Sequence, residues 1–412
     1  MIHTNNFKCG LLGEHLSHSF SPQIHAHLAD YEYKLYEMAE TEVGTFLKNC
    51  PLDAMNVTIP YKKTVMPFLD FISEEAQKIG SVNTIVKKDG QLFGYNTDYY
   101  GFMHMIKSSE ITIKGKKVLV LGTGGASLTV KAVLQDLEAD KIISVSRSGE
   151  VNYDNISEHS DADIIVNTTP VGMFPNNGAS PVNLEDFPSL SGVLDLIYNP
   201  ARTALLCQAE KLGIPFVNGL VMLVSQAKRA CEYFLDCTID DSENKRITEE
   251  IAKQSENIVL VGMPSSGKST AGKKLAEMLD REFVDTDEVI VSMAGMTIPE
   301  IFSKYGEEHF RKIEHEAVKQ TAKRSGLVIA TGGGVVTRQE NYLPLHENGR
   351  IVFIERDINE LSTDGRPLSQ KGNLEKMYEI RLPLYLSFCD AKAQCETDIT
   401  KTVENILKAV NI

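Results

Sequence analysis

A phosphate-binding loop is predicted where the motif GMPSSGKS (262–269) follows the apolar run 258–261. A segment of helical period, 271–279, comes next, so strand, glycine loop and helix stand in the order that this motif requires. Glycines let backbone N–H groups turn toward phosphate, while the helix N-terminus and the ammonium of Lys268 supply positive charge. The motif therefore predicts a nucleoside triphosphate site, with the hydroxyl of Ser269 placed to ligate Mg²⁺.

Two carboxylates follow the next predicted strand, 282–285, and they suit phosphoryl transfer. Asp285 ends that strand, and Asp287 lies two residues later. One carboxylate of such a pair can help to hold hydrated Mg²⁺, and the other can orient and deprotonate an acceptor hydroxyl. The alternative is a turn that contains two aspartates and has no function.

Polar residues in the first hundred positions gather where predicted strands end. They are His18, Ser19, Ser21, Asn56, Thr58, Lys62, Asn83, Asn96, Thr97 and Asp98. Ligands of open α/β sheets lie beyond the carboxyl ends of the strands, and these groups suit a small polyhydroxylated acid. A lysine can also protonate the alkoxide that forms when a ketone accepts hydride. Each residue taken alone is better explained as a cap, a turn or a solvated lysine.

A second glycine-rich turn, GTGGAS (122–127), lies between the predicted strand 117–121 and a predicted helix, 128–137. Such a turn lets a pyrophosphate approach a helix N-terminus, although a plain strand–helix turn is the alternative, because the spacing is not a regular G-x-G-x-x-G. The next strand, 141–145, is followed by Arg147 with no acidic residue beside it. An arginine at this point accommodates a 2′-phosphate, so NADP is favoured over NAD.

The scaffold that must position these residues is predicted to be α/β, because strand-like and helix-like segments alternate along the chain. Further strands are expected at 8–13, 33–39, 54–59, 162–167 and 192–197, and a hairpin joins 82–86 to 91–94. Ser21 and Pro22 indicate the N-cap and first position of a helix that runs to Tyr31.

Composition limits the classes of function. The 412 residues include 42% hydrophobic and 24% charged residues, with a formal net charge of −14. This charge argues against nonspecific binding to nucleic acids or anionic membranes, so anionic ligands must meet local positive sites. The seven cysteines form no CxxC pair. No apolar run is as long as a membrane span, which needs about 18 residues. A cytoplasmic protein is expected, as a monomer or a homodimer.

Four motifs of the first segment resemble the substrate-domain motifs of shikimate dehydrogenases, in the same order. They are SFSP (19–22), NVTIPYK (56–62), GSVNT (80–84) and NTD (96–98). The resemblance implies that Lys62 and Asp98 are the catalytic pair. It implies a shikimate site made by Ser19, Ser21, Thr58, Lys62, Asn83, Asp98, Tyr198 and Gln226. It implies an NADP site made by Gly122, Gly124, Gly125, Ala126, Arg147, Thr168, Gly219 and Met222, although core packing is an equal alternative for Met222.

The segment that begins at the phosphate loop resembles shikimate kinases. The motifs are GMTIPEIF (295–302), GEEHFRKIE (306–314), TGGG (331–334), RPL (366–368) and RLPLY (381–385). The resemblance implies shikimate binding by Asp287, Arg311, Gly333, Gly334 and Arg381, with Asp287 catalytic. It implies an ATP site made by Gly262, Ser265, Ser266, Gly267, Lys268, Ser269, Thr270 and the lid residue Arg366, and Mg²⁺ ligation by Ser269 and Asp285. Residues 361–365 depart from the family because they contain no arginine.

We therefore predict a two-lobed dehydrogenase fused to a P-loop kinase. Its substrate lobe spans 1–101, and its Rossmann-type NADP lobe spans 102–236, with a last helix (219–236) that packs back on the substrate lobe. A polar linker with one short exposed helix spans 237–256, and the kinase spans 257–412. The expected reactions are NADPH-dependent reduction of 3-dehydroshikimate and ATP-dependent phosphorylation of shikimate. The alternatives are a quinate-type dehydrogenase that uses NAD, and a half that binds ligand without turnover.

Overall fold

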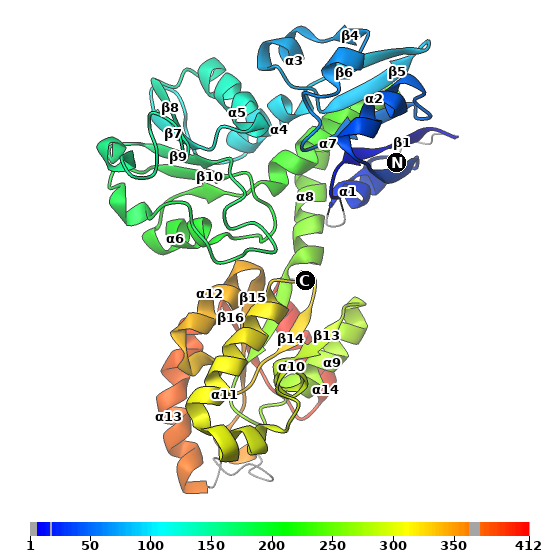
Figure 1. The fold of residues 1–412 in the computed structure, drawn as a ribbon. Coiled ribbons are helices and arrows are strands. Elements are labelled where there is room, and N and C mark those ends of the chain that lie inside the picture. The colour runs from blue at the N-terminus through cyan, green and yellow to red at the C-terminus, as the bar shows by residue number, and fades with distance from the viewer. Residues whose placement is uncertain (1–5, 17–18, 362–370, 412) are drawn as a thin grey trace. The chain divides into compact units, whose positions relative to one another are not determined.

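The computed structural model describes residues 6–16, 19–361 and 371–411. The chain divides into two compact units (Figure 1). The first comprises Met1–Val171, Ser180–Tyr198 and Gln208–Ile251, and the second comprises Gly172–Ala179, Asn199–Cys207 and Ala252–Ile412. Two short segments that precede residue 252 belong to the second unit by this division. The domain boundaries predicted from the sequence stay predictions.

The substrate lobe of the first unit contains a six-stranded mixed sheet of order β2-β1-β3-β5-β6-β4, in which β5 and β6 form the expected antiparallel hairpin. Its elements are β1 (Lys8–Gly13), α1 (Ser21–Leu28), β2 (Glu32–Glu37), α2 (Glu40–Lys48), β3 (Ala54–Val57), η1 (Met66–Phe68), β4 (Phe71–Ile72), α3 (Glu74–Ile79), β5 (Thr84–Lys88), β6 (Gln91–Tyr95) and α4 (Thr97–Lys107).

The cofactor lobe contains a five-stranded parallel sheet of order β11-β10-β9-β7-β8. Its first strand in the chain, β7, lies between β9 and β8, so the strand order reverses beside β7, where open α/β sheets bind their ligands. The elements of the chain from β7 to α8 are β7 (Lys117–Leu121), α5 (Gly125–Asp136), β8 (Lys141–Val145), η2 (Ile156–His159), β9 (Ile164–Asn167), η3 (Leu184–Asp186), β10 (Gly192–Asp195), α6 (Ala204–Leu212), β11 (Phe216–Val217), α7 (Leu220–Leu235) and α8 (Ser242–Ser255).

The second unit is built on a five-stranded parallel sheet of order β13-β14-β12-β15-β16. The elements are β12 (Asn257–Val261), α9 (Lys268–Leu279), β13 (Phe283–Asp285), α10 (Thr286–Ala294), α11 (Ile298–Ala322), β14 (Val328–Ala330), η4 (Val335–Thr337), η5 (Gln339–Asn341), α12 (Tyr342–Glu347), β15 (Gly349–Glu355), η6 (Ile358–Glu360), α13 (Lys371–Phe388), β16 (Ala391–Gln394) and α14 (Ile399–Ala409). The predicted α/β class is confirmed for both units.

The central strand β12 shows why its last four residues, 258–261, are all apolar. Val259 and Val261 belong to the hydrophobic cluster on one side of the sheet, whereas Ile258 and Leu260 belong to the cluster on the other side. Successive strand residues point to opposite faces, and helices cover both faces of a parallel sheet. An unbroken apolar run is therefore required here, where an alternating pattern would leave one face uncovered.

Helix α7 packs against the substrate lobe, although it follows the cofactor lobe in the chain. Its residues Leu220, Val224 and Ala227 share one buried cluster with Ile24 and Leu28 of α1. Its other face meets α4, and the two helices approach closely at Gly101, where a Cβ would lie 2.7 Å from Met222 O and 3.0 Å from Gln226 Cβ. The contact fixes α4, which carries Asp98, against α7, which carries Gln226.

Three local predictions differ from the structure. Phe20, not Ser21, is the N-cap residue of α1, and this helix ends at Leu28 rather than at Tyr31. Helix α5 begins at Gly125 instead of about 128, because the helical conformation extends into the glycine turn. The expected short exposed helix of 237–256 is the longer α8, whose Ile247 and Ile251 are fully buried in the cluster beneath α7. None of the helices in the described chain is long and apolar enough to cross a membrane.

The approach of α4 to α7 leads to a stability prediction. We expect Gly101→Ala to lower the free energy of unfolding of the first unit by about 1–3 kcal/mol, because the added methyl group must displace the backbone carbonyl of Met222. Thermal unfolding of the full chain would measure the change. Lys107→Ala on the exposed side of the same helix is the control, and equal melting temperatures for both variants would contradict the packing argument.

Candidate functional sites

The first candidate site is centred on an ion pair between Lys62 and Asp98. Lys62 Nζ lies 2.5 Å from Asp98 Oδ2, and the side chains are 20% and 11% exposed. Asp98 stands in the first turn of α4, where the partial positive charge of the helix N-terminus stabilises a carboxylate. The backbone of Lys62 is fixed as well, because its carbonyl accepts a hydrogen bond from Val82 N at 2.9 Å. A proton donor and its carboxylate partner are thus held in place together.

A buried network links three further residues of this site. Thr97 N donates to Asn83 Oδ1 at 2.7 Å, which identifies this atom as the amide oxygen, because a backbone N–H can only donate. The Thr97 hydroxyl lies 3.2 Å from the same oxygen and 3.4 Å from Gln226 Oε1. Both amide oxygens therefore face inward to Thr97, and within the described chain no residue accepts a hydrogen bond from Asn83 Nδ2. That NH₂ group remains available as a donor to a ligand oxygen.

The other predicted substrate residues of the first unit lie on neighbouring strand ends. Ser21 N donates to Ser19 Oγ at 3.2 Å, and Thr58 N donates to Leu12 O at 2.9 Å where β3 ends. Phe20 stands between these two serines in the sequence, and the centroid of its ring lies 5.2 Å from that of Tyr198. Burial raises the pKa of the Tyr198 phenol, so this hydroxyl remains a hydrogen-bond donor at neutral pH.

The predicted cofactor turn lies at the reversal of strand order. Gly122 packs against Thr168, since a Cβ would lie 2.7 Å from Thr168 Oγ1. Gly124 is the N-cap of α5 and supplies no side-chain cap, so the first N–H groups of the helix have no side-chain acceptor there. A Cβ on Gly124 or Gly125 would meet open space, and Ala126 follows in the first turn. These features suit a pyrophosphate at the helix N-terminus.

The remaining cofactor predictions divide into exposed and buried residues. Arg147 is exposed just beyond β8, and no residue of the described chain forms an ion pair or hydrogen bond with its side chain. Gly219 lies against the backbone of Leu196, since a Cβ would lie 2.0 Å from Leu196 O. Met222 is 8% exposed and belongs to the core cluster that includes Phe102. This environment agrees with the alternative that Met222 packs in the core.

The phosphate loop of the second unit has the expected conformation around Lys268. The ammonium of Lys268 donates to Gly262 O at 2.9 Å and to Met263 O at 2.8 Å, so it lies inside the loop. Ser266 is buried, Ser265 is partly buried with a φ of 64°, and Gly267 is the N-cap of α9. Thr270 is exposed in the first turn of this helix. The loop and the helix N-terminus thus form one positively polarised concavity.

Oxygen atoms suited to Mg²⁺ stand beside the loop. Ser269 Oγ donates to Asp285 Oδ2 at 2.6 Å, and Asp285 Oδ1 accepts from Asp287 N at 3.0 Å. Hydroxyl and carboxylate oxygens are the ligands that Mg²⁺ prefers, so this pair fits the ion. Asp287 follows in the first turn of α10, where it lies close to the glycine loop after β14: a Cβ on Gly332 would lie 2.8 Å from Asp287 Oδ1.

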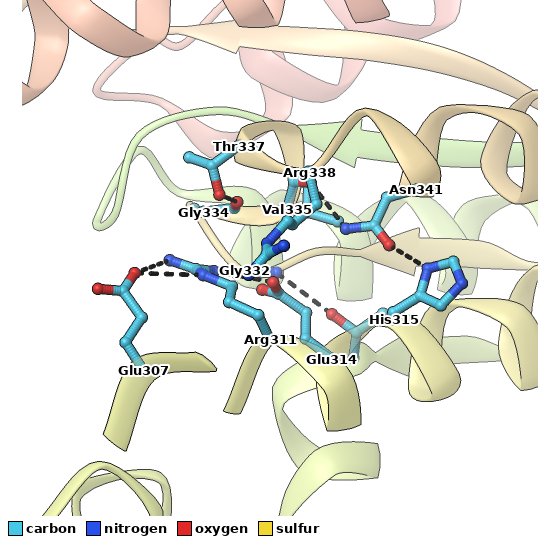
Figure 2. Close-up of polar contacts among 12 residues, drawn as sticks. Glu307, Arg311, Glu314, His315, Gly332, Gly334, Val335, Thr337, Arg338 and Asn341 are labelled. Atoms are coloured by element: carbon cyan, nitrogen blue, oxygen red, sulfur yellow. Dashed lines mark hydrogen bonds and ion pairs between the residues drawn. The ribbon is translucent and has the colours of Figure 1, made fainter. Parts of the chain in front are cut away.

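Arg311 is held by two carboxylates in a nearly buried position. Its Nη1 donates to Glu314 Oε2 at 2.8 Å, and its Nη2 donates to Glu307 Oε1 at 3.0 Å (Figure 2). Helix α11 bends at Gly306, which has a φ of 80°. Glu307 follows this bend and meets Arg311 one helical turn later, as an i,i+4 pair. Burial raises the pKa of the Glu314 carboxyl against the opposing effect of Arg311.

The two predicted substrate arginines converge on the same glycine loop. A Cβ on Gly334 would lie 2.4 Å from Arg311 Nη1, so only glycine permits the guanidinium at this distance. Arg381 Nη1 donates to Gly333 O at 3.0 Å. Two planar guanidinium groups on one loop suit bidentate binding of a carboxylate. Arg366 and the atypical segment 362–365 lie outside the described residues.

Comparison with known proteins agrees with this division of the chain. A family model described as "Shikimate dehydrogenase substrate binding domain" matches residues 11–85, and one described as "Shikimate kinase" matches residues 264–411. The chain is 41% identical over 252 residues to "Shikimate dehydrogenase (NADP(+))" of Clostridium beijerinckii, with 56% of this chain and 93% of that protein covered. The chain belongs to the shikimate dehydrogenase family.

Solved structures support the same assignment for the first unit. Shikimate dehydrogenase 1 from Peptoclostridium difficile is 38% identical with a TM-score of 0.57, and the match covers 60% of this chain and 98% of that one. The Thermus thermophilus enzyme, solved with NADP(H) and shikimate, is 29% identical with a TM-score of 0.55, and the match covers 59% and 99%. Together with the kinase family match, these findings describe an enzyme that joins a shikimate dehydrogenase to a shikimate kinase domain.

The sequence assigned no individual role to two residues that the geometry places beside the sites. Thr97 connects Asn83 with Gln226, and Glu314 holds Arg311. Both occur inside motifs that carry the family resemblance, and Thr97 is also one of the polar residues that gather at the strand ends. Their roles depend on contacts with residues distant in sequence, since Thr97 and Gln226 are 129 positions apart.

The Thr97 network leads to a prediction about local stability. We expect Thr97→Val to destabilise the start of α4 by about 1–3 kcal/mol, because the buried amide oxygen of Gln226 loses its hydrogen-bond donor, the Thr97 hydroxyl. Hydrogen exchange of peptides that cover α4 would measure the change. Thr97→Ser retains the hydroxyl and is the matched control, so equally fast exchange in both variants would contradict the role assigned to the hydroxyl.

Proposed function

We propose that the first unit reduces 3-dehydroshikimate to shikimate with NADPH, and that the second phosphorylates the shikimate 3-hydroxyl with ATP and Mg²⁺. The product of the first reaction is then the substrate of the second. The observation that carries the first assignment is the Lys62–Asp98 pair, and for the second it is the convergence of Arg311 and Arg381 on the glycine loop beside Asp287.

In the proposed reduction, NADPH supplies a hydride to the ketone carbon. Lys62 would protonate the developing alkoxide, while Asp98 orients the ammonium. The Asn83 amide and the hydroxyls of Ser19, Ser21 and Thr58 would orient the ring through its hydroxyl groups. Gly124 and Gly125 would approach the pyrophosphate, and the exposed Arg147 would bind the 2′-phosphate.

In the proposed phosphorylation, ATP supplies the phosphoryl group and Mg²⁺ neutralises developing charge. Ser269 and Asp285 would hold the ion, and Lys268 would contact the phosphates. Arg311 and Arg381 would clamp the shikimate carboxylate. Asp287 lies beside Gly332, at the start of the same glycine loop, so the ring hydroxyl would face this carboxylate. Asp287 would orient this hydroxyl and accept its proton.

The decisive test follows both reactions in one preparation of the full chain with 3-dehydroshikimate, NADPH, ATP and Mg²⁺. We expect Lys62→Ala to lower kcat for NADPH oxidation by about 10²- to 10⁴-fold, because general acid catalysis is lost. ADP formation from added shikimate should stay unchanged. Asp287→Asn should give the reverse pattern, so each variant is the folding control for the other. Near-normal NADPH oxidation by Lys62→Ala would exclude the proposed role of this lysine.

The cofactor preference has its own test. We expect Arg147→Ala to raise the KM for NADPH by about 10- to 100-fold, because a charge-assisted contact to the 2′-phosphate is lost, and to leave the KM for NADH unchanged. Steady-state kinetics with the two cofactors and with shikimate or quinate would separate the proposed enzyme from a quinate-type dehydrogenase that uses NAD. An equal effect on both cofactors would contradict the assignment of Arg147.

A further inference from the structure

Tyr385 of α13 is a fully buried residue that touches both loops of the kinase domain. Its ring stacks on Phe353 of β15, with centroids 5.0 Å apart and an angle of 9° between the planes. Its hydroxyl donates a hydrogen bond to Gly333 O of the glycine loop and lies 3.9 Å from Met263 Sδ of the phosphate loop. Neither the sequence interpretation nor the proposed mechanism gives this hydroxyl a role.

The two loops are themselves in direct contact beside Tyr385. A Cβ on Gly333 would lie 2.7 Å from Pro264 Cδ and 2.8 Å from Pro264 N, so the glycine loop rests on the backbone of the phosphate loop. The carbonyl of Gly333 accepts from two donors, Tyr385 Oη and Arg381 Nη1. The position of this carbonyl therefore depends on both side chains.

The direction of the Gly333 carbonyl determines what the loop offers to a ligand. The carbonyl of Gly333 and the N–H of Gly334 belong to one planar trans peptide, so they point in opposite directions. In the described chain, no residue accepts a hydrogen bond from the amide of Gly334, and the Arg311 guanidinium lies next to this residue. A fixed carbonyl thus directs a free N–H group to the position where Arg311 would meet a carboxylate.

We propose that Tyr385 is a positioning residue for shikimate, which holds the Gly333–Gly334 peptide against the phosphate loop so that the amide of Gly334 can donate to the substrate carboxylate. This inference rests on the proposed kinase function. Arg381 also donates to this carbonyl, through Nη1, but the proposed function gives its guanidinium a second task at the substrate carboxylate. Tyr385 has no such second task.

The state of the phenol supports this role. Burial raises the pKa of Tyr385 to about 12, and the nearby Arg381 opposes that rise. The hydroxyl consequently keeps its proton at any pH at which the enzyme works, and it donates continuously to the carbonyl. Its stacking on Phe353 leaves the ring in place when only the hydroxyl is removed.

The test is Tyr385→Phe in the full chain, which keeps the ring and removes the hydrogen bond. We expect the KM of the kinase reaction for shikimate to rise about 3- to 10-fold, as loss of one hydrogen bond predicts, with a smaller change in the KM for ATP and an unchanged rate of NADPH oxidation. Tyr378→Phe is the matched control, because Tyr378 lies on the same helix and forms no hydrogen bond with the described chain. Its kinetic constants should equal those of the unaltered chain.

The possible results separate this inference from the proposed function. If the unaltered chain does not phosphorylate shikimate, the kinase assignment fails before Tyr385 is considered. If it does, an unchanged KM for shikimate in Tyr385→Phe overturns the positioning role. A lowered melting temperature with parallel changes in both KM values also overturns it, because that pattern indicates a general packing defect. Equilibrium binding of shikimate without nucleotide provides a second measurement of the expected loss.

Discussion

The ion pair between Lys62 and Asp98 is the interaction on which the first unit's site depends. The two residues are 36 positions apart, so the pair forms only when the turn after β3 and the start of α4 come together. The backbone of Lys62 is fixed by a hydrogen bond from Val82, and the helix turn that carries Asp98 is capped by the side chain of Asn96. Helix α4 is in turn positioned by its close approach to α7 at Gly101. The chemistry of one pair thus requires the packing of the whole lobe.

The second unit solves a different problem, because it must place two anionic ligands side by side. The glycine loop 332–334 contacts Pro264 of the phosphate loop at Gly333 and the guanidinium of Arg311 at Gly334. Absence of Cβ atoms brings the two loops as close as backbones permit. The carboxylates of Glu307 and Glu314 keep the guanidinium in position without a ligand, which reduces the ordering that binding must supply.

Most of the scaffold and part of each site were predictable from the sequence, for identifiable reasons. Strands such as β7 and β12 are short apolar runs whose type is fixed by burial on both faces, and they were placed almost to the residue. The predicted start of α5 was wrong because glycine has a low helix propensity and so does not indicate the first helical turn. The length of α8 was underestimated because its many charges hide the spacing of Ile247 and Ile251, which are buried only through contact with the substrate lobe.

The residues to which the sequence assigned no individual role share one property, which also explains how this acidic chain can bind anions. Thr97, Glu314 and Tyr385 act on other protein groups and fix their direction, so no ligand chemistry marks them in the sequence. In the proposed reduction the ring is oriented by neutral amides and hydroxyls around one ion pair, since the reaction needs a single proton. In the proposed phosphorylation, negative charge accumulates on the ligands, so the reaction requires two guanidinium groups and an ammonium. Local cations held by buried partners supply that charge in spite of the net −14.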